Sequence, residues 1–391
     1  MKKILFVSPN EDPFSLAYGG SQRTNLLLQA CAACGTVDVI CFRDLSSEHD
    51  MGDNVRIIYG QSLERLRKKG VKLFLNNIHN NLFSWRIDDK NKVDSGKESI
   101  IDSFVQQKPY DWIVTRYMNH ALSMGLIKYA DRLVVDIDDS PVDKAMDRVK
   151  TASTLPSKVI KWLYVQGVRK AVRSFTAKVA VTFFSNPLHA LNYNTRFLPN
   201  IPFHNANIQD ISFERISRGR ILFVGLMSYY PNYLGMDHFL THIYPYLDST
   251  INWEIHICGR DLDESYQKKW STIKGVRYLG FVEDLSKEYS ESEIVIVPIY
   301  HGSGTCIKVL EAMQMHRMVI TTPKGARGYD GILASGEDYL LANNDKEYIS
   351  LLNESINNIP LQTAVTEHAS TIIENHYNKS AVINTVKDAL L

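Results

Sequence analysis

A glycine-rich stretch between an apolar run and a helical pattern constrains this chain more than any other feature. The apolar run, residues 294–298, is short, rich in β-branched side chains and closed by proline, which is typical of a strand buried on both faces. After the glycines of residues 301–305, apolar side chains recur at helical spacing from Ile307 to Met315. The stretch therefore predicts a strand, a glycine loop and a helix.

The loop and the start of the helix offer a site for phosphate. A helix N-terminus presents unpaired N–H groups and a positive dipole end, and glycines let a bulky anion approach them. Lys308 and Glu311 lie one turn apart, so their side chains project from roughly one face. The lysine can pair with phosphate oxygens, and the carboxylate can accept from both hydroxyls of a ribose. A nucleoside diphosphate fits this pattern, although a buried loop beside an ordinary surface ion pair fits it as well.

Several motifs across residues 219–330 resemble, in order and spacing, the donor-binding half of the group-1 (family 4) glycosyltransferases. These motifs are Gly280-Phe281-Val282-Glu283-Asp284, Val297-Pro298, Gly302-Ser303-Gly304-Thr305, the run from Lys308 to Met313, and Val319-Ile320-Thr321-Thr322. The resemblance implies the GT-B architecture, in which two Rossmann-like, doubly wound α/β domains face across a cleft. The C-terminal domain would hold the nucleotide sugar. The N-terminal half resembles the family only loosely.

Two positions depart from the family's pattern. Many members carry two glutamates eight positions apart; Glu311 matches the second, but Ser303 stands at the first. Many also place an arginine after the glycine that corresponds to Gly225, where this chain has Leu226, and no lysine follows in the next few residues. The resemblance therefore leaves Lys308 as the main phosphate-binding cation of this half.

The resemblance also implies donor contacts from glycine turns in both halves. Gly19 and Gly20 would reach the diphosphate and the sugar, and Arg23 would supply charge that is missing after Gly225. The backbone of Val282 would contact the base. The full predicted donor set is Gly19, Gly20, Arg23, Gly225, Arg260, Val282, Ser303, Gly304, Thr305, Lys308, Glu311 and Arg327. Each glycine turn can equally serve only to reverse the chain, and Arg327 can be a bystander.

Three carboxylates, Asp136, Asp138 and Asp139, end an apolar strand of the first half. Ligands in open α/β sheets bind beyond the carboxyl ends of the strands, so Asp138 or Asp139 could deprotonate an acceptor hydroxyl or hydrogen-bond to it. His120 is a further candidate for an acceptor contact. Asp139 and the Ser-Pro pair after it are also typical of a helix start. We predict no metal site, because two consecutive aspartates do not enclose an ion and GT-B enzymes generally use no metal.

Composition and charge exclude several functional classes. The net charge of +1 gives no overall basis for nucleic-acid binding. No segment approaches the roughly 18 consecutive apolar residues of a spanning helix. The five cysteines lie mostly in apolar segments, which favours buried, reduced thiols and a cytoplasmic protein. Basic amphipathic stretches at 62–86 and 144–178 suit peripheral contact with the inner face of a membrane, or else the solvated faces of ordinary helices.

The sequence predicts four consecutive parts. Residues 1–200 form an N-terminal Rossmann-like domain on the acceptor side, and residues 201–218 form a linker. Residues 219–362 form a second Rossmann-like domain that binds the nucleotide sugar. Residues 363–391 form a C-terminal helix that packs back towards the first domain. Strands that alternate with helices across both halves indicate parallel, doubly wound sheets. The oligomeric state is left open.

The predicted function is that of a glycosyltransferase. It would move a sugar from a nucleoside-diphosphate sugar, its substrate, to a hydroxyl of a glycan or lipid-linked acceptor, with retention and without a metal or other cofactor. The resemblance suggests bacterial-type cell-surface polysaccharide biosynthesis. Two alternatives stay open: a nucleotide-sugar epimerase or hydrolase on the same fold, and a non-catalytic protein that binds nucleotide sugars or glycans. A dehydrogenase is disfavoured, since no Gly-x-Gly-x-x-Gly follows the first strand.

Overall fold

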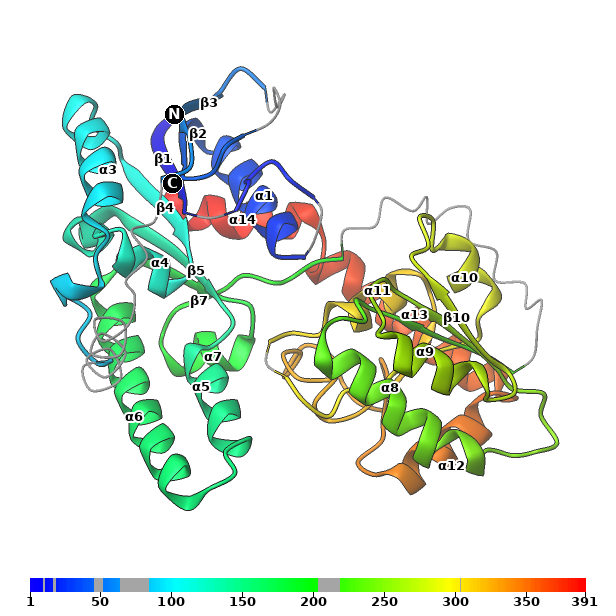
Figure 1. Ribbon diagram of the computed structural model, residues 1–391. Coiled ribbons are helices and arrows are strands. Elements are labelled where there is room, and N and C mark those ends of the chain that lie inside the picture. Colours follow the sequence, from blue (N-terminus) through cyan, green and yellow to red (C-terminus); the bar gives the residue numbers. More distant parts are fainter. Residues whose placement is uncertain (10, 17–18, 46–51, 64–83, 203–218, 303) are drawn as a thin grey trace. The chain divides into compact units, whose positions relative to one another are not determined.

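The computed structural model in Figure 1 describes residues 1–9, 11–16, 19–45, 52–63, 84–202, 219–302 and 304–391. They form two compact units. The first consists of residues 1–199 with 379–391, and the second of residues 200–378. Most of the linker predicted at 201–218, and most of the basic stretch at 62–86, lies outside the described residues.

The described part of the first unit is built on a seven-stranded parallel sheet with strand order β3-β2-β1-β4-β5-β6-β7. Its strands are β1 (Lys2–Ser8), β2 (Gly35–Cys41), β3 (Val55–Gly60), β4 (Trp112–Arg116), β5 (Leu133–Asp138), β6 (Val181–Phe184) and β7 (Arg196–Phe197). The central strands are buried along their length because helices cover both faces, which explains their continuous apolar runs.

Helices of the first unit begin where the sequence supplies caps. Asp94 caps α3, and Ser140 caps α5 with proline at the first helical position. The helices are α1 (Gly19–Ala32), α3 (Ser95–Gln107), α4 (Met118–Ser123), α5 (Pro141–Lys150), α6 (Leu155–Lys178), α7 (Pro187–Asn192) and α14 (Lys379–Leu390), with 3-10 turns at Lys90–Lys92 and Leu126–Arg132. Asp139 lies just before the cap residue and does not itself cap the helix.

The second unit repeats the design with a six-stranded parallel sheet of order β10-β9-β8-β11-β12-β13 among its described residues. The strands are β8 (Arg220–Val224), β9 (Glu254–Cys258), β10 (Val276–Gly280), β11 (Ile294–Val297), β12 (Met318–Thr321) and β13 (Leu340–Leu341). The helices are α8 (Tyr230–His242), α9 (Glu264–Ser271), α10 (Ser286–Glu291), α11 (Ile307–Gln314), α12 (Asp345–Ser355) and α13 (Ile359–His376), with a 3-10 turn at Tyr244–Tyr246. Both units are thus Rossmann-like.

The C-terminal tail returns to the first unit, but not as one helix. The segment predicted as a single helix over 363–391 is divided between α13 and α14, with a break at Tyr377 and Asn378. α13 packs against α11 in the second unit, whereas α14 lies along α1 in the first (Figure 1). The break allows one tail to complete two separate cores.

Each sheet has a point where the strand order reverses. In the first sheet it lies between β1 and β4, and in the second between β8 and β11. Crossover helices leave opposite faces of the sheet at such a point, so the loops beyond the carboxyl ends separate and leave room for a ligand. Ligand-binding side chains are therefore expected at these two edges. Among the described residues, no helix has the length and apolarity needed to span a membrane.

Candidate functional site

The glycine loop of the second unit lies beyond β11, at the point where the strand order reverses. Gly302 and Gly304 have φ values of 98° and 93°, in the left-handed region that glycine enters without strain. α11 begins at Ile307, a few residues later, so the strand, loop and helix occur as the sequence predicts. Ser303 lies outside the described residues, and its predicted donor contact stays a prediction. Thr305 is half-buried at the end of the loop.

Arg327 supports the loop. Its guanidinium donates to the carbonyl oxygen of Gly304 at 2.8 Å and to that of Gly302 at 3.4 Å. The following residue, Gly328, has a φ of 102°, and a Cβ there would lie 2.7 Å from Oγ1 of Thr305. The turn around Arg327 is therefore packed directly on the glycine loop. This geometry gives Arg327 a structural task, and its predicted donor contact remains a prediction.

Lys308 is held in place by neutral partners. Its ammonium group donates to Oδ1 of Asn232 at 2.8 Å and lies 5.4 Å from the centre of the Phe223 ring. Asn232, in the first turn of α8, donates in turn to the carbonyl oxygen of Leu226 at 2.7 Å. An amide and an aromatic ring, both uncharged, thus orient the ammonium group of Lys308 beside the start of α11. That arrangement suits an anionic ligand.

Glu311 is oriented by a buried tyrosine. The hydroxyl of Tyr289 donates to Oε1 of Glu311 at 2.9 Å. Burial of Tyr289, together with the charge of Glu311, raises the pKa of that tyrosine well above its usual value, so it remains a donor. One turn separates Glu311 from Lys308 on α11, which places both side chains beside the same ligand position. Neither Tyr289 nor the role of Asn232 is visible from the spacing of the motifs.

Gly225 directly follows β8 and lies close to the Lys308 side chain. A Cβ at this position would lie 2.8 Å from Nδ2 of Asn232 and 3.3 Å from Cε of Lys308. The glycine therefore leaves room for the Asn232–Lys308 pair rather than serving as a turn. Beyond it, Leu226 is 44% exposed and brings no charge.

Gly225→Ala is expected to weaken nucleotide binding about tenfold while leaving the fold intact, because the new methyl group displaces the side chains of Asn232 and Lys308 and not backbone. The measurement is the rise in the midpoint temperature of thermal unfolding. It is recorded with the nucleoside diphosphate that stabilises the wild type. Gly96→Ala is the control, since a Cβ there meets only ordinary contacts. Equal shifts in the wild type and in Gly225→Ala would contradict the assigned role of the glycine.

Arg260 and Val282 follow neighbouring strands at the same carboxyl edge of the second sheet. Arg260 comes after β9, its side chain is 57% exposed, and its Nε lies 3.7 Å from the carboxylate of Asp261. Val282 comes after β10 and is half-buried beside Phe281, which is largely exposed. Neither placement conflicts with the predicted donor contacts, which remain predictions.

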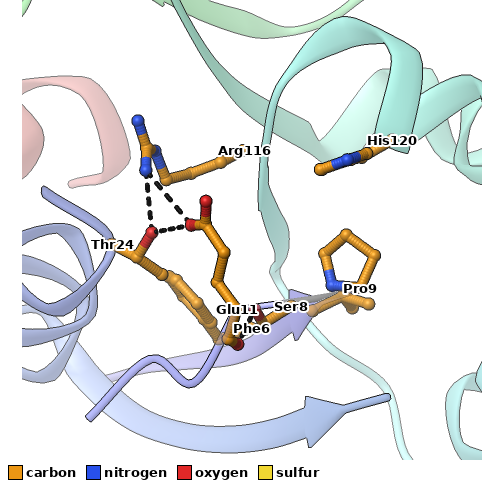
Figure 2. Close-up of a pocket in the computed structure, with 8 residues that line it drawn as sticks. Phe6, Ser8, Pro9, Glu11, Thr24, Arg116 and His120 are labelled. Carbon is orange, nitrogen blue, oxygen red and sulfur yellow. Dashed lines mark hydrogen bonds and ion pairs between the residues drawn. The ribbon is translucent and has the colours of Figure 1, made fainter. Parts of the chain in front are cut away.

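A small pocket marks the corresponding edge of the first sheet. It is lined by Phe6, Val7, Ser8, Pro9, Glu11, Thr24, Arg116 and His120, at the ends of β1 and β4 (Figure 2). Arg116 donates to Oγ1 of Thr24 at 2.8 Å and lies 3.3 Å from Oε2 of Glu11, and His120 lies across the pocket from them (Figure 2). His120 is thus at the edge where the sequence predicts an acceptor contact.

Arg23 is held in a buried ion pair of the first unit. Its guanidinium is 3% exposed and binds both oxygens of Asp136 at 2.8 Å, and it also donates to the carbonyl oxygens of Leu198 and Pro199. These contacts give Arg23 a structural task in the core of the first unit, and its predicted donor contact remains a prediction. Gly19 and Gly20 are the first residues of α1, and the carbonyl oxygen of Gly20 accepts from Arg116 at 2.6 Å.

The two candidate aspartates at the end of β5 differ in environment. Oδ2 of Asp138 accepts from Arg116 at 2.8 Å; burial opposes its ionisation, but Arg23, Arg116 and Lys144 outweigh burial and hold the pKa of Asp138 below its usual value. Burial and the charge of Asp138 raise the pKa of Asp139. Lys144, 3.3 Å away, offsets this rise only in part. Asp138 thus belongs to the ion cluster, and Asp139 is the better candidate for an acceptor contact.

Backbone strain accompanies this edge. Tyr117 and Asp138 have φ values of 63° and 64° although neither is glycine, and they follow or end the adjacent strands β4 and β5. Such conformations are sparsely populated and persist where the surrounding structure enforces them, often at functional sites. Arg116 contacts both residues, because it donates to Oδ2 of Asp138 and its guanidinium lies 4.5 Å from the centre of the Tyr117 ring. It is a member of the ion cluster, which consists of Arg23, Arg116, Asp136 and Asp138.

Comparisons with known proteins agree with the geometry of the second unit. Residues 218–358 match the family described as glycosyl transferases group 1. No curated protein matches the chain. Among solved structures, sucrose-phosphate synthase from Thermosynechococcus elongatus has a TM-score of 0.68 at 13% identity, with 99% of this chain and 98% of that chain covered.

Two further structures match along their whole length. TarM of S. aureus, solved with fondaparinux, α-GlcNAc-glycerol and UDP, has a TM-score of 0.65 at 10% identity, with both chains fully covered. WaaG, a glycosyltransferase involved in lipopolysaccharide biosynthesis, has a TM-score of 0.61 at 14% identity, with 99% of each chain covered. At these identities the likeness establishes the fold.

Proposed function

We propose that this chain, whose residues 218–358 belong to the group-1 glycosyltransferases and whose two units have the GT-B fold, transfers a sugar from a nucleoside-diphosphate sugar to an acceptor hydroxyl. The observation that carries the proposal is Lys308, which is held by neutral partners at the start of α11 beside a glycine loop. A solved structure of the same fold, TarM, contains UDP and a glycoside, which supports a nucleotide-sugar donor and a glycan or lipid-linked acceptor.

The proposed reaction breaks the bond between the anomeric carbon of the sugar and the diphosphate oxygen. Negative charge then develops on the departing diphosphate, where the N–H groups at the start of α11 and the ammonium group of Lys308 stabilise it. Glu311, oriented by Tyr289, accepts hydrogen bonds from the ribose. These groups stabilise charge that appears in the transition state, and such groups raise the rate of the chemical step.

We further propose retention without a metal. The acceptor oxygen forms its new bond on the face from which the diphosphate leaves, and its proton passes to an oxygen of that diphosphate. Asp139 and His120 are assigned to acceptor contacts rather than to covalent catalysis. We place the reaction in the cytoplasm, in the synthesis of a bacterial-type cell-surface polysaccharide.

A thermal-shift screen tests the donor site directly. UDP, GDP, dTDP and CDP are added separately without metal to the wild type and to a Lys308→Ala, Glu311→Ala double variant. A ligand that binds the folded state raises the melting temperature by mass action. We expect one nucleotide to shift the wild type and not the variant. Absence of any shift in the folded wild type would overturn the proposal.

A non-catalytic binding protein is the second candidate, because the exposed side chain of Leu226 leaves no charge where many relatives carry arginine. Incubation with the matching nucleotide sugar separates the two functions. Transfer to an added glycan supports the proposal, and binding without turnover supports the second candidate. Conversion of the donor in the absence of acceptor would point to an epimerase or a hydrolase instead.

The raised pKa of Asp139 predicts a pH dependence of transfer. The ionised carboxylate can accept from an acceptor hydroxyl, so kcat/KM should rise as pH increases through the raised pKa of Asp139 and then level off. Asp139→Asn is expected to lower the plateau about tenfold and to remove this acidic limb. Asp143→Asn, one turn into α5, is the control. A profile that Asp139→Asn leaves unchanged would remove Asp139 from the acceptor site.

A further inference from the structure

The first turns of α6 expose apolar side chains on the face away from the core. Leu155, Val159, Trp162 and Leu163 follow the spacing i, i+4, i+7 and i+8, so they share one face, and each is between 50% and 75% exposed. Ile160, beside them, is 63% exposed. Single exposed apolar residues are common, but five within nine residues of one helix form a contiguous patch, which marks an interaction surface.

The opposite face of the same helix is anchored in the core. Val165, Val168, Ala171, Val172 and Phe175 are buried in the first unit. α5 packs along α6, and the two helices form a hairpin whose connection, residues 151–154, lies at the end away from the sheet (Figure 1). The apolar patch is therefore carried at the end of a rigid projection.

A basic band follows the apolar patch on the outward face. Arg169, Lys170 and Arg173 are exposed and continue the face of Leu155, Val159 and Trp162 towards the C-terminal end of α6. Residues 148–178 contain eight lysines and arginines and no aspartate or glutamate, although the whole chain has a net charge of only +1. The positive charge is thus concentrated on the hairpin.

The order of the two zones matches the layers of a lipid surface. At 1.5 Å per residue, the basic band begins about 10 Å along the helix from Trp162. With the end of the hairpin directed into the bilayer, the apolar side chains enter the boundary between headgroups and acyl chains while the cationic side chains meet the lipid phosphates. A second copy of the chain would bring a like-charged band against this one, which disfavours self-association.

We propose that the outward face of α6 docks the protein on an anionic lipid bilayer, with residues 155–163 entering the interface and the band of Arg169, Lys170 and Arg173 on the headgroup phosphates. This docking goes beyond the transfer activity, because it needs neither donor nor acceptor. It is peripheral, since the exposed apolar segment covers less than half of the length of a spanning helix.

Vesicle sedimentation of the full chain tests this docking. Vesicles of phosphatidylcholine with about 30% phosphatidylglycerol are compared with pure phosphatidylcholine at low and high salt. We expect salt-sensitive binding to the anionic vesicles, reduced at least about tenfold by the triple change of Arg169, Lys170 and Arg173 to glutamate. Trp162→Glu with Ile160→Glu should also abolish binding. Wild-type protein that does not bind anionic vesicles would overturn the proposal.

Two matched controls make similar changes of charge and hydropathy on the second unit, so that they test whether the position on α6 matters. The change of Lys268, Lys274 and Lys287 to glutamate alters net charge equally on the second unit, and Ile359→Glu replaces an equally exposed apolar residue there. Both should bind as the wild type does; a loss equal to that of the α6 variants would refute the proposed face. Sedimentation velocity without vesicles completes the test. An association that only the α6 variants abolish would assign the face to a second copy instead.

Discussion

Replacing Lys308 by alanine is expected to lower kcat/KM for sugar transfer by about 10²- to 10³-fold, mainly through kcat. The reason is that the ammonium group, placed by Asn232 and the Phe223 ring, faces charge that grows as the diphosphate departs. Removal of such a group costs more in the transition state than in the ground state. The protein should unfold at nearly the same temperature, because the partners of Lys308 are neutral and leave no stranded charge.

Steady-state kinetics with the matching nucleotide sugar checks this prediction. Lys287→Ala, an exposed lysine on α10, is the control and should leave both constants unchanged. Lys308→Arg keeps the positive charge but replaces the compact ammonium group with a planar guanidinium, so it should recover only part of the rate. If Lys308→Ala raised KM alone, Lys308 would bind donor and transition state equally. The developing charge would then be stabilised elsewhere, with Arg260 and Arg327 as the first residues to examine.

The strand, loop and helix around Lys308 are predictable because their signals are local. A β-branched run closed by proline forms β11, two glycines take the left-handed conformation, and apolar spacing defines α11. The same holds for most strands of both sheets, whose apolar runs are continuous because parallel strands are covered on both faces. Local pattern was therefore sufficient for two parallel, doubly wound sheets, whereas the GT-B architecture was implied by the resemblance to the glycosyltransferases.

The contacts that orient the site are not local, and the sequence did not reveal them. Tyr289 precedes Glu311 by 22 residues on another helix, and Asn232 precedes Lys308 by 76. Arg116 and Asp136 meet because β4 and β5 pair with these two residues directly opposite each other. That register is a property of the assembled sheet, so the ion cluster that captures Arg23 could not be read from spacing.

Asp136→Asn is expected to destabilise the first unit by about 3–5 kcal/mol, because it leaves two buried arginines without their shared carboxylate. The Asp136 side chain is fully buried and accepts from Arg23 at 2.8 Å and from Arg116 at 2.9 Å. Urea unfolding combined with hydrogen exchange of peptides from β4 and β5 measures the effect within the first unit. Asp102→Asn, which breaks a partly exposed pair with Lys128, should cost no more than about 1 kcal/mol.

A double variant identifies the cause of that loss. Adding Arg23→Met to Asp136→Asn removes one of the two buried guanidinium groups that lose their shared partner, so the double variant should be more stable than Asp136→Asn alone. If it were less stable, the loss would come from packing around Asp136 and not from uncompensated charge. Arg116 also lines the pocket of Figure 2, where it contacts Thr24 and Glu11. An Asp136→Asn protein that is still folded at low temperature should therefore lose transfer activity, because the ion cluster fixes the wall of the pocket as well as the core.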